Sequence, residues 1–211
     1  AIVKHPKIKA VSFTGSTATG RSIASLAAPL FKKVSLEMGG KNANIIFADA
    51  DFDKAVNMTV RSSFLNQGQI CLCGSRIFVE KSIYNKFRDA LVAKTKLLKV
   101  GNPTDESTDQ GALVSEPHMT KVLSYLELAR TEGGKILCGG ARAEVKGSER
   151  GYFVQPTLIE GLGPACRTNQ EEIFGPTVCL ISVKNLNEAI KVCNSVSYGL
   201  SSSIYTNNIS N

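Results

Sequence analysis

The fold is decided by residues 9–37, KAVSFTGSTATGRSIASLAAPLFKKVSLE. Residues 9–14 predict a β-strand, residues 17–28 a helix that Pro29 ends, and residues 33–37 a second strand. A strand, a glycine turn, a helix and a strand make one crossover unit of a parallel sheet. A doubly wound domain that binds a nucleotide needs about five or six strands. Residues 1–39 therefore predict the C-terminal part of such a Rossmann-type domain.

Residues 40–211 predict a second α/β domain, incomplete at its C-terminus. Its expected strands are residues 44–47, 76–79, 136–138, 152–154, 177–181 and 202–205. One expected helix begins after Asp51. Three further helices are expected at residues 82–98, 115–132 and 187–198. In the first of these helices an apolar side chain recurs every four residues, at Phe52, Val56, Val60 and Phe64. Residues 142–150 predict an exposed, mobile loop.

The bulk composition excludes several classes of protein. The chain has 43% hydrophobic and 20% charged residues, which is typical of a soluble globular protein. Its net charge of +7 comes from Lys and Arg that are scattered, so nucleic-acid binding is not expected. No apolar run reaches the roughly 18 residues of a membrane span. The 6 cysteines are too sparse for a disulfide scaffold and lack metal-ligand spacing, so we expect reduced thiols, no metal and a cytoplasmic location.

Cys71 lies in FLNQGQIC, residues 64–71, on a loop that contains Gly68 and follows a predicted helix. The thiolate is the nucleophilic form of cysteine, and backbone N–H groups of such a loop can stabilise an oxyanion that forms beside it. The residues alone leave open a second interpretation, in which Cys71 is a small buried side chain that only packs. Cys73 is the rival thiol.

Glu37 ends the second predicted strand, 34 residues before Cys71, and precedes Gly39 and Gly40. Parallel sheets bind ligands at the carboxyl ends of their strands, so we expect its carboxylate in a cleft, partly buried, as a general base. Pairing with Lys33 or Lys41 is the alternative.

Two more strings carry a binding signal. GSTATG, residues 15–20, joins a strand to a helix, and a helix N-terminus receives phosphate groups. The string lacks the full dinucleotide fingerprint and is weak alone. EEIFGP, residues 171–176, places two acids before an aromatic residue and a turn, which could also be a simple loop cap.

Together, the four strings resemble the NAD(P)-dependent aldehyde dehydrogenase family, over essentially the whole chain. NQGQICLC, with RSSF before it, is most similar to the 2-aminomuconic and 2-hydroxymuconic semialdehyde dehydrogenases. The resemblance implies that Cys71, and not Cys73, attacks an aldehyde to give a thiohemiacetal. Loss of hydride to the nicotinamide then leaves a thioester, which water activated by Glu37 hydrolyses to the acid.

The same resemblance implies a set of residues for the cofactor, NAD with NADP also open. Gly15 and Ser16 would contact the pyrophosphate, with Met38 beside them. Glu172 would bind the nicotinamide ribose, and Phe174 would lie against the nicotinamide.

Other parts of the family's machinery lie outside these 211 residues, including a second oxyanion donor, the adenosine-binding residues and the hairpin that joins subunits. We therefore expect the isolated chain to bind the dinucleotide poorly and to be weakly active or inactive. A longer parent is expected to be a homodimer or homotetramer. A cysteine acyl hydrolase or acyl transferase using Cys71 and Glu37, and a non-catalytic structural relative, are the alternatives.

Overall fold

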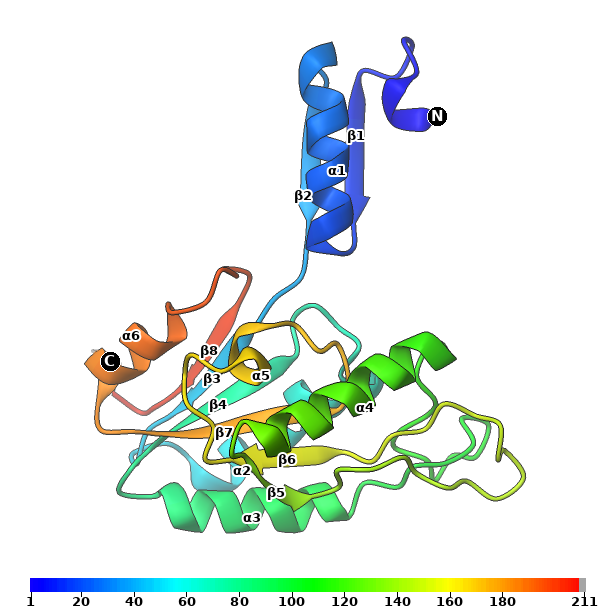
Figure 1. Ribbon diagram of the computed structural model, residues 1–211. Coiled ribbons are helices and arrows are strands. Elements are labelled where there is room, and N and C mark those ends of the chain that lie inside the picture. The colour runs from blue at the N-terminus through cyan, green and yellow to red at the C-terminus, as the bar shows by residue number, and fades with distance from the viewer. Residues whose placement is uncertain (209–211) are drawn as a thin grey trace. The chain divides into compact units, whose positions relative to one another are not determined.

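The computed structural model describes residues 1–208, and the chain forms two compact units, Ala1–Gly40 and Lys41–Asn211 (Figure 1).

The first unit is the crossover that the sequence predicts. It contains β1 (Ala10–Thr14), α1 (Thr17–Ala27) and β2 (Lys33–Glu37), with short 3-10 turns η1 (Ile2–Lys4) and η2 (Ala28–Leu30). The two strands are parallel, with Thr14 opposite Glu37 at their carboxyl ends. Ser16 caps α1 by accepting the N–H of Thr19 at 3.3 Å, because serine suits the first position of a helix.

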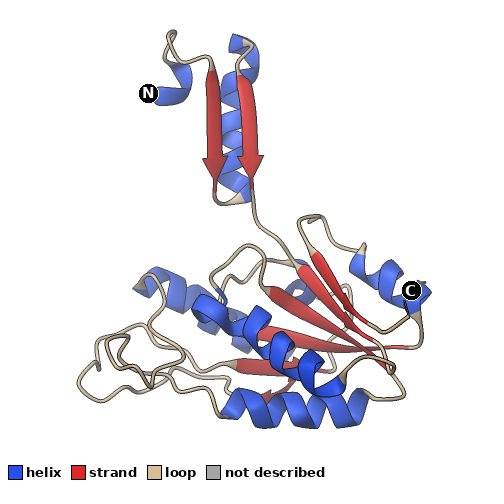
Figure 2. Ribbon diagram, turned by 180° about the vertical axis from the view of Figure 1, so that it is seen from behind, coloured by secondary structure: helices blue, strands red, loops and turns tan. Residues whose placement is uncertain are grey.

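The second unit is a sheet between two layers of helices, as Figure 2 shows. Its strands are β3 (Asn42–Ile46), β4 (Gly74–Glu80), β5 (Lys135–Cys138), β6 (Thr157–Glu160), β7 (Thr177–Val183) and β8 (Ser202–Tyr205). Its helices are α2 (Phe52–Phe64), the 3-10 turn η3 (Leu65–Gly68), α3 (Tyr84–Lys96), α4 (Glu116–Thr131), α5 (Arg167–Gln170) and α6 (Leu186–Cys193). The strand order is β5-β6-β7-β4-β3-β8, and every neighbouring pair is parallel except β5 with β6.

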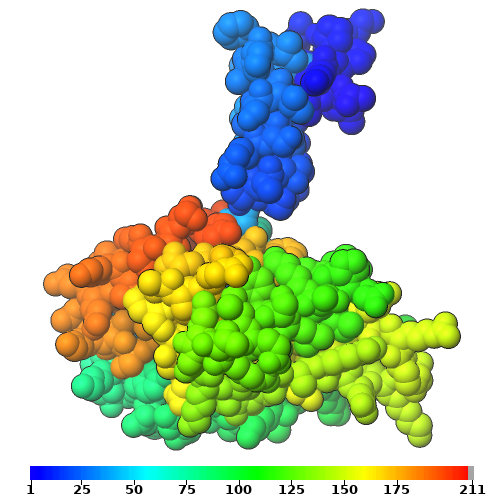
Figure 3. All heavy atoms as spheres, viewed as in Figure 1, coloured from blue at the N-terminus to red at the C-terminus, as the bar shows by residue number. Residues whose placement is uncertain are grey.

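The core lies on both faces of this sheet. Alternate residues of a strand point to opposite faces, so in β4 Ile77 and Val79 pack against α2 and α3, whereas Phe78 packs against α6. On α2 the predicted apolar stripe is confirmed, with Val56 and Phe64 buried and Phe52 and Val60 packed around them. The buried side chains of α4 join a separate cluster on the other face. Figure 3 shows α4, in green, next to the yellow segment that includes α5.

Two sequence predictions in this unit are wrong. Residues 152–154 form only an isolated bridge between Val154 and Arg142, and the missed strand is β6, which begins after Pro156. The last helix ends at Cys193 instead of residue 198. The segment 142–150 is mostly exposed, as expected, although Ala143 and Val145 are buried against Phe153, and its mobility stays a prediction.

Within residues 1–208, the structure contains no helix with the length and apolar character needed to cross a bilayer.

Candidate active site

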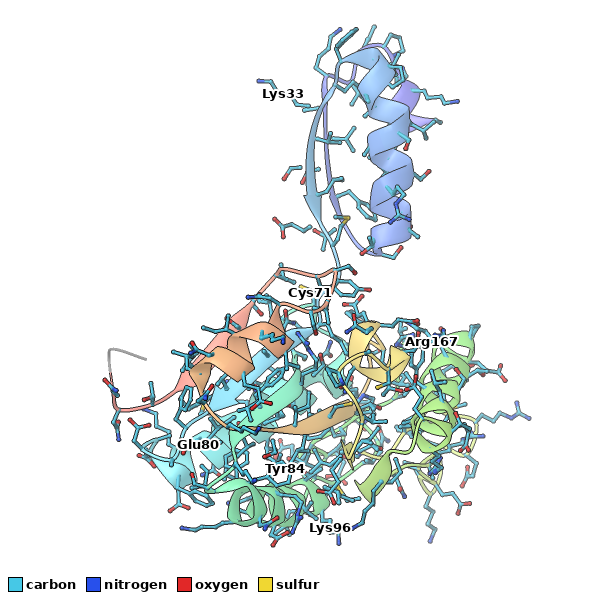
Figure 4. All side chains as sticks on the ribbon, turned by 60° about the vertical axis from the view of Figure 1, so that its left-hand side comes forward. Lys33, Cys71, Glu80, Tyr84, Lys96 and Arg167 are labelled. Atoms are coloured by element: carbon cyan, nitrogen blue, oxygen red, sulfur yellow. The ribbon has the colours of Figure 1, made fainter. Side chains whose placement is uncertain are left out.

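The loop that carries Cys71 begins with an abrupt change of direction after α2. Asn66, Gln67 and Gly68 all have left-handed backbone conformations, with φ of 51°, 57° and 69°. A turn follows, in which the N–H of Cys73 donates to the carbonyl oxygen of Ile70 at 3.0 Å. Cys71 is the second residue of this turn, immediately before β4. Figure 4 labels Cys71, which lies three residues before β4 begins, and Glu80, the last residue of that strand.

The two thiols of this loop lie in different environments. The Cys71 side chain is partly exposed, whereas Cys73 is buried with 9% of its surface accessible. Burial raises the pKa of the Cys73 thiol, so this group stays protonated and unreactive near neutral pH. Accessibility therefore favours Cys71 as the nucleophile of the pair.

Gly68 fixes where the loop lies. A Cβ atom at this position would come within 2.3 Å of the carbonyl oxygen of Gly175, so the two backbones are in direct contact. Only glycine permits this approach together with a positive φ. The contact brings the loop of Cys71 against the EEIFGP string, more than a hundred residues further along the chain.

Buried polar side chains hold the ends of the loop, and the sequence analysis did not identify them. Ser63 donates to the carbonyl oxygen of Gly74 at 2.8 Å, and Gln110 donates to that of Phe64 at 2.8 Å. In a sequence, such residues stand out only as polar side chains within an otherwise apolar pattern. That pattern does not indicate which group each side chain binds.

Phe174 is held in a left-handed conformation with φ of 61°. His118, near the start of α4, places its Nε2 atom 2.6 Å from the carbonyl oxygen of Phe174. Because a carbonyl can only accept, the ring must carry its proton on Nε2. The two rings also meet edge to face, with centroids 6.0 Å apart. His118 therefore contacts both the backbone and the ring of a predicted cofactor residue.

The two acids of EEIFGP have different surroundings. Glu171 binds Tyr125 and accepts from Arg167 Nε at 2.7 Å, and these hydrogen bonds lower the pKa of its carboxyl. The backbone carbonyl of Glu172 accepts from Lys121 at 3.0 Å. The Glu171 carboxylate is therefore bound to other side chains of the protein, and the assignment of the ribose contact to Glu172 stays a prediction.

In the first unit, the predicted site residues share one edge of the sheet. The N–H of Gly15 donates to the carbonyl oxygen of Glu37 at 3.0 Å, so the glycine turn and the glutamate are neighbours. Met38 turns back onto α1, where its sulfur would lie 2.6 Å from a Cβ placed on Gly20. The Glu37 side chain is exposed, whereas partial burial was expected. The reason is that β1 and β2 form a sheet of only two strands, which α1 covers on one face.

Lys41 begins the second unit and is a buried cation. Its side chain is 2% exposed, and its Nζ atom has no hydrogen-bond partner among the described residues. Burial lowers the pKa of Lys41 from 10.5 to about 8. Together with the buried Arg76, it lines a cavity of about 310 Å³ that also borders on Asn42, on residues 193–194 and on residues 198–202.

The sequence model of the Aldehyde dehydrogenase family matches residues 1–211. The chain belongs to this family. The resemblance of the four strings is thus confirmed, and so is the α/β fold expected from it.

Individual relatives of the chain agree with this assignment. It is 47% identical to the 2-aminomuconic semialdehyde dehydrogenase of Danio rerio, over 99% of the chain and 44% of the relative. It is 46% identical to the 2-aminomuconic 6-semialdehyde dehydrogenase of Pseudomonas sp, over 99% of the chain and 43% of the relative. The betaine aldehyde dehydrogenase of Staphylococcus aureus, solved in complex with NAD+, superposes with a TM-score of 0.96 at 39% identity, over 99% of the chain and 41% of that structure. The chain thus spans less than half the length of these relatives.

Proposed function

We propose that Cys71 and Glu37 are the nucleophile and the general base of an aldehyde dehydrogenase that oxidises a semialdehyde to the carboxylic acid. The observation that carries the proposal is the partly exposed Cys71 on a turn whose loop packs against the segment of Phe174, in a chain that matches the family along its whole length. Residues 1–39 would belong to the cofactor domain and residues 40–211 to the thiol domain.

Within each unit taken by itself, the residues present fit one part of an NAD molecule. α1 begins at a Gly-Ser turn, and its first N–H groups point away from the helix, where a pyrophosphate would find both hydrogen-bond donors and the positive end of the helix dipole. The ring of Phe13 lies 2.5 Å from a Cβ built on Gly15, so a side chain at this turn would require the ring to move. Phe174 offers a ring that His118 holds in place for the nicotinamide, and Glu172 would bind the ribose. When bound, NAD accepts the hydride.

The proposed reaction divides one oxidation into two steps. The Cys71 thiolate adds to the aldehyde carbon, and the C=O electron pair becomes an alkoxide that nearby backbone N–H groups stabilise. The alkoxide re-forms the carbonyl as the hydride leaves, which gives a thioester. Glu37 then removes a proton from water, the hydroxide attacks the thioester, and cleavage of the C–S bond releases the acid and the thiolate.

Sequence identity supports the substrate class. The chain is 45–47% identical to the 2-aminomuconic semialdehyde dehydrogenases of four animals. Its identity to the betaine aldehyde dehydrogenase is lower, at 39%. We therefore propose an unsaturated semialdehyde that carries a carboxylate. A homodimeric or homotetrameric assembly and a cytoplasmic location stay predictions.

A chimera tests the proposal, because the chain spans only part of its relatives. In this chimera, residues 1–211 replace the matching segment of the Danio rerio enzyme, so that the relative supplies all other parts. We expect NADH to form with 2-aminomuconic semialdehyde and NAD, and less with betaine aldehyde. Cys71→Ser should abolish NADH formation, and Glu37→Gln should let the thioester accumulate after one turnover. Hydrolysis of an ester without NADH from any aldehyde would instead support the acyl hydrolase.

A further inference from the structure

The turn that carries Cys71 is bound by one buried amide side chain. The Nδ2 group of Asn42 donates to the carbonyl oxygens of Cys71, at 2.6 Å, and of Cys73, at 3.0 Å. Its Oδ1 atom accepts the backbone N–H of Ser201 at 3.1 Å. Asn42 is only 4% exposed, so water does not compete for these contacts. One side chain therefore joins the thiol loop to the segment that precedes β8.

The backbone that carries the Asn42 side chain is also held in place. Arg76, 2% exposed, donates from Nε and Nη2 to the carbonyl oxygen of Lys41 at 3.0 and 2.7 Å. Lys41 is the residue before Asn42, so the backbone from which the Asn42 side chain extends cannot shift without breaking these charge-assisted bonds. The guanidinium also donates to Val192 and Cys193.

We propose that Asn42 is a positioning residue for the Cys71 nucleophile. This inference rests on the proposed function of Cys71, and it assigns to Asn42 the orientation of the turn rather than contact with the substrate. A peptide group is planar, so holding the carbonyl of Cys71 also sets the direction of the Leu72 N–H, which points away from Asn42. Fixing the turn in this way keeps both the sulfur and the backbone donors in the arrangement that acyl chemistry requires.

Asn44 provides a matched control. It lies two residues further along β3 and is also 4% exposed. Its Nδ2 group donates to Ser62 Oγ at 2.7 Å, and its Oδ1 atom accepts from Ser203 Oγ at 2.7 Å. Both asparagines thus make buried bonds to the segment at β8, but only Asn42 binds the turn of Cys71.

The experiment compares Asn42→Asp with Asn44→Asp in the 211-residue chain. Aspartate keeps the size and the acceptor of each side chain and removes the donor. Acylation by p-nitrophenyl acetate is followed by release of p-nitrophenolate, with acetyl-Cys71 identified by peptide mass spectrometry and Cys71→Ala as background. Alkylation of Cys71 by iodoacetamide, which forms no oxyanion, is measured in parallel. Asn42→Ser and Asn44→Ser form a second pair in case an aspartate variant does not fold, as judged by circular dichroism.

We expect the Asn42 variant to acylate at least about tenfold more slowly than the unmodified chain, with alkylation changed by less than about threefold. The Asn44 variant should stay within about threefold in both reactions. Equal slowing in the two variants, an equal fall of acylation and alkylation, or an absence of acetyl-Cys71 in the unmodified chain would each overturn the inference. If the chimera forms no NADH but the difference between the variants persists, the dehydrogenase proposal fails and the positioning role of Asn42 stands.

Discussion

The backbone of Gly68 touches the backbone of Gly175, so closely that a Cβ on the first would come within 2.3 Å of the carbonyl oxygen of the second. This contact joins the loop of the proposed nucleophile to the segment of the proposed nicotinamide residue Phe174. Both segments are irregular, and each restricts the movement of the other.

Replacing Gly68 by alanine should disturb this contact. The left-handed φ of 69° costs an alanine about 1–2 kcal/mol, and the clash with Gly175 adds to that cost. We expect the free energy of unfolding, measured with urea, to fall by about 3 kcal/mol or more. Gly147 is the control, because its φ of 79° imposes the same backbone cost and a Cβ there would have no atom within 4 Å. Equal losses for Gly68→Ala and Gly147→Ala would show that the contact contributes nothing.

The burial of Lys41 should make stability depend on pH. Its pKa is about 8 in the folded chain and 10.5 in the reference state, so the folded chain loses the proton first. Between these two values the unfolded chain binds more protons, and the free energy of unfolding therefore rises with pH. Below pH 8 both states are charged and the full penalty of burial remains. Lys41→Met should remove this rise, which amounts to at most about 3 kcal/mol.

The measurement is a series of urea unfolding curves between neutral pH and pH 10.5, the unperturbed value. Lys146→Met removes an exposed lysine and should leave the pH dependence unchanged. Cysteines and tyrosines titrate in the same range, so the relevant quantity is the difference between each variant and the unmodified chain. If the free energy of unfolding changed with pH in the same way for Lys41→Met and for the unmodified chain, the prediction would be contradicted.

His118 should affect cofactor binding through Phe174. Phenylalanine at position 118 retains an aromatic ring but cannot donate to the Phe174 carbonyl, now 2.6 Å from Nε2. In the chimera, His118→Phe is expected to raise the KM for NAD several-fold, and His118→Gln, which keeps a donor, less so. Steady-state kinetics at saturating aldehyde give both values. An unchanged KM in the phenylalanine variant would mean that Phe174 keeps its conformation without the histidine.

The isolated chain should bind NAD weakly and form little NADH. It spans 44% of the length of the Danio rerio relative, so more than half of that relative has no counterpart in the chain. Isothermal titration calorimetry measures the affinity directly. A dissociation constant in the micromolar range would contradict this expectation and would mean that the turn at Gly15 and the segment of Phe174 suffice for binding.

Local sequence patterns predicted most of the fold. The crossover of β1, α1 and β2, the cap of α2 at Asp51 and that of α4 at Ser115 all depend on neighbouring residues, and the structure has them as expected. The pattern failed at Tyr152-Phe153-Val154, where apolar side chains pack although the backbone forms a loop. It also failed at β6, which forms its backbone hydrogen bonds with β5 and β7, both distant from it or separated by a loop in the sequence.

The candidate site was predictable only in part. The loop of Cys71, the glutamate and the glycine turn each have a local signature, and the roles given to them stay predictions. Asn42, Arg76 and His118 gave no such signal, because each acts through a partner distant in sequence. Asn42 and Ser201, for example, are 159 positions apart. Polar residues of this kind reveal their partners only after the chain has folded.

The Asn42 contact at Ser201 uses the main chain and leaves the hydroxyl of that serine out of it. Most substitutions at position 201 therefore leave the hydrogen bond to Asn42, and with it the turn of Cys71, intact. Proline is the exception. Proline has no amide hydrogen to give, so among close relatives of this chain proline should be missing at that position, while position 42 keeps a side chain able to reach both carbonyls.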